Sequence, residues 1–75
     1  MNVNKSIVEF NLVNSPIYEE SDRKICINLN NVEAWTEIVT DVLRIFTTNH
    51  DYLVACDKET FEYNYFSWAN AFKKF

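Results

Sequence analysis

The sequence contains no glycine, one proline, two cysteines and a single histidine. A chain without glycine cannot build a glycine-rich phosphate loop. Its turns with positive φ must use Asn or Asp, and asparagine is abundant. Two cysteines, Cys26 and Cys56, are too few for the dense disulfide framework of small secreted domains. We expect both thiols to be reduced in a cytoplasmic protein, with a Cys26–Cys56 disulfide as the alternative.

Basic residues are also scarce, with 7 Lys and Arg against 11 Asp and Glu, and the net charge is −4. This balance argues against direct binding to nucleic acid, because phosphate contacts need Lys and Arg. It argues equally against an anionic membrane, and no apolar run in the sequence is long enough to span a bilayer. An acidic surface favours a protein partner with a basic surface, although a charge of this size also serves solubility.

Apolar residues, in contrast, are plentiful. The 75 residues are 48% hydrophobic and 16% aromatic, which predicts one folded domain over residues 1–75. Residues 6–13 and 24–29 alternate between apolar and polar side chains and are expected to form two antiparallel strands. Residues 17–22 between them are expected to be a solvated connection.

A helix is predicted after Asn30, which can cap it, with Glu33 three residues later as in a capping box. Its apolar face recurs at helical spacing and should cover the sheet. The residues of that face are Val32, Trp35, Ile38, Val39, Val42, Leu43 and Phe46. Asn49 or His50 should end this helix, and residues 51–56 alternate as a third strand.

The C-terminal part of the sequence fits two patterns. Phe61, Tyr65, Trp68, Phe72 and Phe75 follow a helical spacing, with Asp57 as a cap and Lys73 and Lys74 in the last turn. Residues 60–66 also alternate like a strand. The expected fold is therefore α+β, a small three-stranded, mainly antiparallel sheet with helices on one face. Its order is β-β-α-β-α, with β-β-α-β-β-α as the alternative.

Two acidic groups are candidate partner-binding residues. Glu33, Glu37 and Asp41 would lie about 6 Å apart along the predicted helix, similar to successive phosphates of a nucleic-acid strand. Glu19, Glu20 and Asp22 form the second group. The alternative for both groups is an ordinary solvated face. Asp57, Glu59 and Glu62 form a third acidic cluster, whose charges would stabilise the N-terminus of a C-terminal helix if one forms there.

Aromatic residues supply a third candidate. If residues 58–66 are helical, Tyr63 and Phe66 lie opposite the apolar stripe and stay exposed for a partner or for a second copy of the chain. Catalysis is not expected, because His50 and the two cysteines show neither the spacing of a zinc site nor a recognisable nucleophile motif. No metal or cofactor is expected.

In size, charge, asparagine content and lack of catalytic motifs, the whole chain is similar in kind to small acidic inhibitors made by phages and mobile elements, including anti-CRISPR and anti-restriction proteins. The resemblance implies a stoichiometric inhibitor, and a nucleic-acid mimic in some cases, that docks on a nuclease or similar host enzyme. An immunity protein or antitoxin that neutralises a toxin, and a subunit of an oligomeric assembly such as a homodimer, remain the alternatives.

Overall fold

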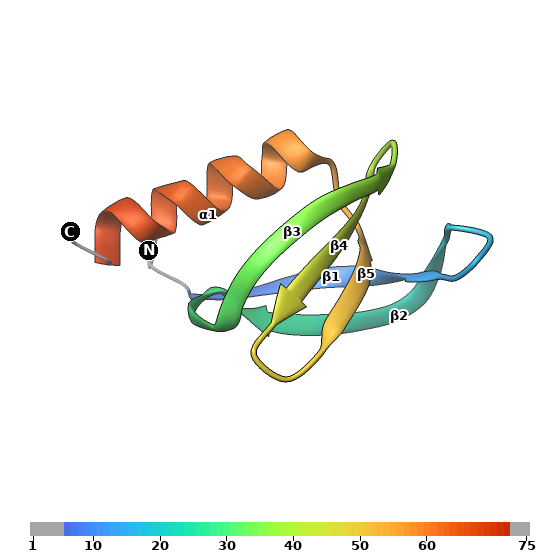
Figure 1. Cartoon of the computed structure of the whole chain (residues 1–75), viewed down its shortest axis with the longest axis horizontal. Coiled ribbons are helices and arrows are strands. Elements are labelled where there is room, and N and C mark those ends of the chain that lie inside the picture. Colours follow the sequence, from blue (N-terminus) through green and yellow to red (C-terminus); the bar gives the residue numbers. More distant parts are fainter. Residues whose placement is uncertain (1–5, 73–75) are drawn as a thin grey trace.

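The computed structural model describes residues 6–72 and contains one curved antiparallel sheet and one helix (Figure 1). The strands are β1 (Ile7–Asn14), β2 (Glu19–Asn28), β3 (Val32–Val39), β4 (Val42–Thr47) and β5 (Asp51–Ala55). A 3-10 turn, η1 (Leu29–Asn31), joins β2 to β3, and the helix α1 (Lys58–Phe72) follows β5. The five strands are arranged in the order β2-β1-β5-β4-β3.

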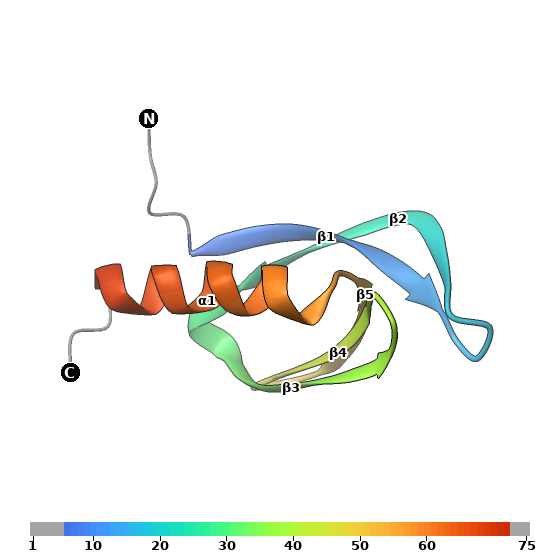
Figure 2. The ribbon, with the colours of Figure 1, turned by 90° about the horizontal axis from the view of Figure 1, so that it is seen from above.

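The sheet is strongly bent into two arms that diverge, and α1 packs in the space between them (Figure 2). One arm is the β1–β2 ribbon and the other is the β3–β4–β5 meander, and a bridge between Leu12 and Val54 joins them. The ring of Phe61 on α1 lies 6.0 Å from Phe10 on β1 and 4.9 Å from Trp35 on β3. The helix therefore contacts both arms through one side chain.

The hydrophobic core fills the space between the arms and the helix. Its residues come from both arms, η1 and α1, and are Phe10, Ile27, Leu29, Val32, Leu43, Ile45, Val54, Phe61, Trp68 and Ala69. Phe61, Leu43, Ile45 and Val54 are at most 1% exposed, so this junction is almost completely buried. Burial of this kind is the main favourable contribution to folding.

The predicted three-stranded sheet with several helices is wrong, because the segment expected to be a helix after Asn30 forms β3 and β4. Two bulges explain the error. The register of β3 shifts between Val32 and Ala34 and again between Glu37 and Val39. A bulge adds a residue to one strand and disturbs the strict alternation of side chains. As a result Val32 and Trp35 both contribute to the core although they are three residues apart, which is the spacing of one face of a helix.

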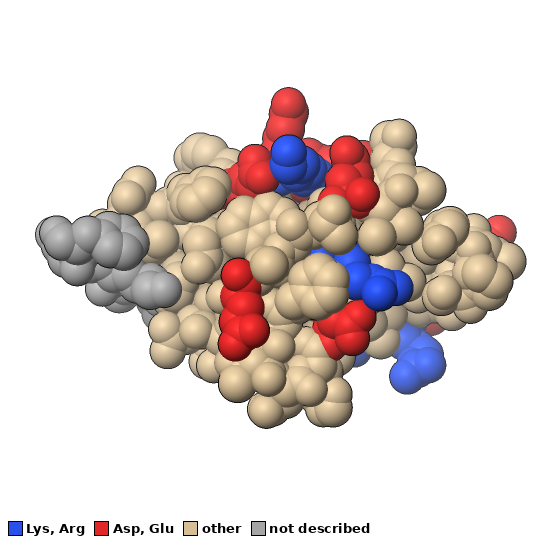
Figure 3. All heavy atoms as spheres, in the orientation of Figure 1, with Lys and Arg blue, Asp and Glu red and all other residues tan. Residues whose placement is uncertain are grey.

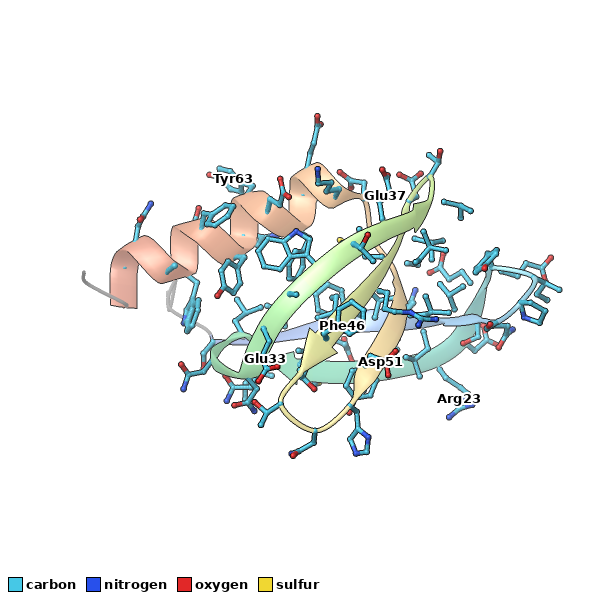
Figure 4. The ribbon with its side chains drawn as sticks, in the orientation of Figure 1. Arg23, Glu33, Glu37, Phe46, Asp51 and Tyr63 are labelled. Carbon is cyan, nitrogen blue, oxygen red and sulfur yellow. The ribbon has the colours of Figure 1, made fainter. Side chains whose placement is uncertain are left out.

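The turn between β3 and β4 is a further reason why the helix prediction for this segment failed. Asp41 has φ 64°, and its neighbour Thr40 completes the connection between Val39 and Val42. Aspartate tolerates the left-handed region better than most residues. The β-branched residues of this segment also favour strands over helices. As a result Phe46, expected on the buried helix face, is half-buried on the outer face of β4, next to the fully buried Ile45 (Figure 4).

Other elements match the sequence more closely. The strands predicted at 6–13, 24–29 and 51–56 correspond to β1, the second half of β2, and β5. The connection predicted at 17–22 is shorter, because β2 already begins at Glu19. The C-terminal helix is confirmed over Lys58–Phe72, and Phe61 and Trp68 of its predicted stripe are buried. Phe75, Lys73 and Lys74 lie outside the described residues.

Within residues 6–72, α1 is too short and too polar to cross a membrane, and the same holds for the brief η1 turn.

Candidate interaction surface

A shallow groove lies between the β3–β4 turn and the first turns of α1. We call it the acidic groove, because its lining comprises five carboxylates and one ammonium group: Glu37, Asp41, Asp57, Glu59, Glu62 and Lys58. Figure 3 shows the acidic side chains gathered along the edge of the molecule above α1 and the β3–β4 turn. Neighbouring carboxylates with low-dielectric walls focus a negative potential that attracts cations.

The fold holds two of these carboxylates by hydrogen bonds and fixes the backbone of a third acidic residue. Asp57 caps α1, since the backbone N–H of Thr60 donates to Asp57 Oδ2 at 2.9 Å. Glu62 accepts a hydrogen bond from Trp35 Nε1 at 3.0 Å and lies 3.9 Å from Lys58 Nζ. Asp41 is fixed by the turn, where its carbonyl accepts from the backbone N–H of Cys56 at 2.9 Å. The groove thus lies where hydrogen bonds join β3 to α1 and the β3–β4 turn to the end of β5.

The hydrogen bonds at Asp57 also control its ionisation. Donation by Thr60, from its side chain and its backbone, holds the pKa of the Asp57 carboxyl below its ordinary value. A donor to the carboxylate favours the charged form. Asp57 therefore keeps its negative charge at any pH near neutrality, and the cap and the groove depend on the same charge.

Exposed aromatic rings lie on α1 beside the acidic groove. Tyr63 is 74% exposed and Phe66 is 51% exposed, and with Glu59 they share one helix face at positions i, i+4 and i+7. The Phe66 ring also contacts Trp35 at 5.9 Å. Figure 4 shows Tyr63 on the outer side of α1. We call Tyr63 and Phe66 the aromatic ridge.

The structure brings together some of the predicted site residues and separates others. Glu37 and Asp41 line the acidic groove, and Glu20 shares a second depression with Asp41 and Asp57. Glu33 lies at the opposite end of β3 from Glu37 (Figure 4). Since β3 and β4 replace the helix, the even 6 Å spacing of Glu33, Glu37 and Asp41 does not exist, and the phosphate-like pattern based on it is wrong.

The remaining predicted residues keep their exposure. Glu19 and Asp22 are exposed on β2, and Tyr63 and Phe66 are exposed as the helical interpretation expected. Asp57, Glu59 and Glu62, the third acidic cluster of the sequence, were expected only to stabilise the N-terminus of a C-terminal helix, and they line the acidic groove as well. Their spacing at the start of a predicted helix was the available signal, but only the fold places the β3–β4 turn beside them.

The cysteines and the histidine lie elsewhere. Both thiols are free, with Cys26 exposed and Cys56 half-buried. Burial first, and then the charge of Asp57, raises the pKa of the Cys56 thiol. Cys26 and His50 line one small polar depression together with Tyr52. In residues 6–72, a cluster of three or more His, Cys, Asp or Glu side chains positioned to hold a metal ion is absent.

Comparisons of the chain with protein-family models, with curated proteins and with solved structures give no match.

Proposed function

We propose that this protein is a binding protein that docks on a basic surface of a nucleic-acid-handling enzyme, such as a nuclease, and inhibits it stoichiometrically. The observation that supports this most directly is the position of the aromatic ridge beside the acidic groove. Charge and exposed aromatic area are the two components that protein interfaces use for approach and for retention. The proposed setting is the cytoplasm, where two free thiols would stay reduced.

The two components have different roles. The carboxylates of the acidic groove attract Lys and Arg side chains that would otherwise contact phosphates, and they increase the rate of encounter at low salt. Tyr63 and Phe66 supply rigid apolar area that is already ordered by α1, so docking costs little side-chain entropy there. An inhibitor of this kind needs no catalytic group, because occupying the basic site of the enzyme is sufficient.

The test begins with affinity capture from lysate of the cell in which the gene occurs, followed by mass spectrometry. A groove variant carries Glu37→Gln, Asp41→Asn and Glu59→Gln. It leaves Asp57 and Glu62 in place because they cap α1 and bond to Trp35. A comparison variant carries Glu19→Gln, Asp22→Asn and Glu33→Gln, which also removes three negative charges, but from residues outside the acidic groove.

The partner should be retained by the wild type and by the comparison variant, and its purified nuclease activity should be inhibited by both. The groove variant and Tyr63→Ala should bind at least about tenfold more weakly, which corresponds to about 1.4 kcal/mol. Added salt should slow association with the wild type more than with the groove variant. Equal binding by the groove variant and the wild type would exclude the acidic groove as the docking site.

A further inference from the structure

A second groove, which differs from the acidic groove in the charge of its lining, lies where the β1–β2 ribbon meets β4 and β5. Its walls include Arg23 from β2 and Arg44 from β4, which are the only two arginines of the sequence. Figure 3 shows basic groups at the lower right of this face, and Figure 4 labels Arg23 and Asp51 there. In a chain of net charge −4, the fold brings both arginines to the lining of one groove.

Arg44 uses only part of its hydrogen-bonding capacity. Its Nη1 lies 3.4 Å from Asp51 Oδ2, with both side chains partly exposed. Its Nε is buried and has no hydrogen-bond partner within the described residues. Guanidinium binds a carboxylate best in a bidentate manner, through two parallel N–H donors. The Arg44 side chain as a whole is 40% exposed, so the guanidinium is partly open to solvent while its Nε–H lacks a partner.

Arg23 is held in the opposite wall by a local distortion of β2. The register between β1 and β2 shifts next to Asn11 and Val13, so that β2 bulges around Ser21 and Arg23. Ser21 Oγ donates to the carbonyl of Leu12 at 3.1 Å and accepts from the backbone N–H of Arg23 at 3.2 Å. The serine thereby ties the bulge to β1 and fixes the backbone from which Arg23 extends.

The remaining lining of the second groove determines the kind of anion that fits. Arg23 and Arg44 carry two positive charges and Asp51 carries one negative charge, so these three groups sum to +1. Leu12 and Leu53 add apolar surface to the same groove. A dianion would leave excess negative charge beside Asp51, whereas a monoanion is balanced. A ligand with one carboxylate and an apolar part matches both the charge and the surface.

We propose that Arg23 and Arg44 form a binding site for a carboxylate that carries an apolar group, as in a small hydrophobic carboxylic acid. The ligand carboxylate takes the place of Asp51 on Arg44 and pairs at the same time with Arg23. Its apolar part rests against Leu12 and Leu53. This site is independent of the acidic groove, because the two grooves share no lining residue.

Nuclear magnetic resonance tests this directly, since the Nε–H signals of the two arginines report on their own guanidinium groups. The ¹⁵N-labelled protein is titrated with phenylacetate, with the neutral phenylacetamide and with inorganic phosphate. Phenylacetate should shift both Nε–H signals along a saturable curve. Phenylacetamide should leave them unchanged, and phosphate should give only weak shifts that do not saturate.

Three variants complete the experiment. Arg23→Lys and Arg44→Lys keep the charge but lose the bidentate donor pair, and each should abolish the saturable shift at the remaining arginine. Lys24→Gln removes a neighbouring positive charge outside the groove and should leave the curve intact. Backbone amide spectra identify any variant that fails to fold. Saturation by phosphate at lower concentration than phenylacetate, an equal response to phenylacetamide, or no saturable shift in the folded wild type would overturn the proposal.

Discussion

The contact between α1 and the two arms of the sheet depends on Phe61, and replacing this residue is the strongest available test of the fold. The Phe61 side chain is 1% exposed and its ring contacts Phe10, Trp35 and Tyr65. A buried phenylalanine removes about 150–250 Å² from water, which at about 25 cal/mol per Å² gives an upper value of about 4–6 kcal/mol. Phe61→Ala should therefore destabilise the protein by about 3–5 kcal/mol, the usual cost of such a cavity.

This loss is large for a small domain, because 75 residues at 0.05–0.15 kcal/mol each give a free energy of unfolding of about 4–11 kcal/mol. Urea unfolding followed by tryptophan fluorescence and circular dichroism measures it. Phe66→Ala is the matched control, since Phe66 lies on the same helix but is 51% exposed. It should cost less than about 1.5 kcal/mol. A Phe61→Ala variant within about 1 kcal/mol of wild type, or equal effects of the two variants, would refute the assigned core.

Three further predictions concern single contacts. Since the pKa of Asp57 is lowered in the folded state, its contribution to stability is complete above the ordinary value of 3.8 and is lost as pH falls through the lower folded pKa. Thermal melts between about pH 5 and about pH 2.5 should thus show that acid lowers the melting temperature of Asp57→Asn, which keeps a capping oxygen, less than that of the wild type. Identical pH profiles of the melting temperature would contradict this. Iodoacetamide should alkylate Cys26 faster than Cys56 at pH 8, as read by mass spectrometry, because Cys56 is half-buried with a raised pKa; the reverse order would be inconsistent with the structure. Glu62→Ala removes the acceptor of the Trp35 indole N–H and should cost about 1 kcal/mol, whereas Glu62→Gln retains an acceptor oxygen and should cost less; equal losses in urea unfolding would argue against that hydrogen bond.

The sequence predicted the elements whose patterns are local and undisturbed. The alternation of Val8, Phe10 and Leu12 indicated β1. The four-three spacing of Phe61, Tyr65 and Trp68 indicated α1 with Asp57 as its cap. In these segments the periodicity of the apolar residues agrees with the element that forms.

The prediction failed where tertiary pairing overrides the local pattern. The bulges of β3 give Val32 and Trp35 a helical separation, and the turn at Asp41 contains neither glycine nor proline to mark it. Only the pairing of β3 with β4, in which Leu43 and Ile45 are fully buried, decides between helix and strand for this segment. The same error displaced the candidate site, because Glu33 and Glu37 share a helix face in one fold and lie at opposite ends of a strand in the other.

The acidic groove was therefore beyond prediction for a physical reason. Glu37 and Asp41 belong to the β3–β4 segment, whereas Asp57 and Glu62 belong to the junction of β5 with α1. These two segments meet only because β4 pairs with β5 and because Trp35 packs on α1. Charge spacing along the sequence carries no information about such a meeting of separate segments.

The most direct test of the account is hydrogen–deuterium exchange of this protein with and without its captured, purified partner. Docking through the acidic groove and the aromatic ridge predicts slower exchange in the β3–β4 turn at 38–42 and in the first half of α1 at 58–66, with the β1–β2 turn at 15–18 unchanged. Slower exchange confined to the β1–β2 ribbon or to the β4–β5 loop would show that the partner binds elsewhere and would contradict the proposed docking surface.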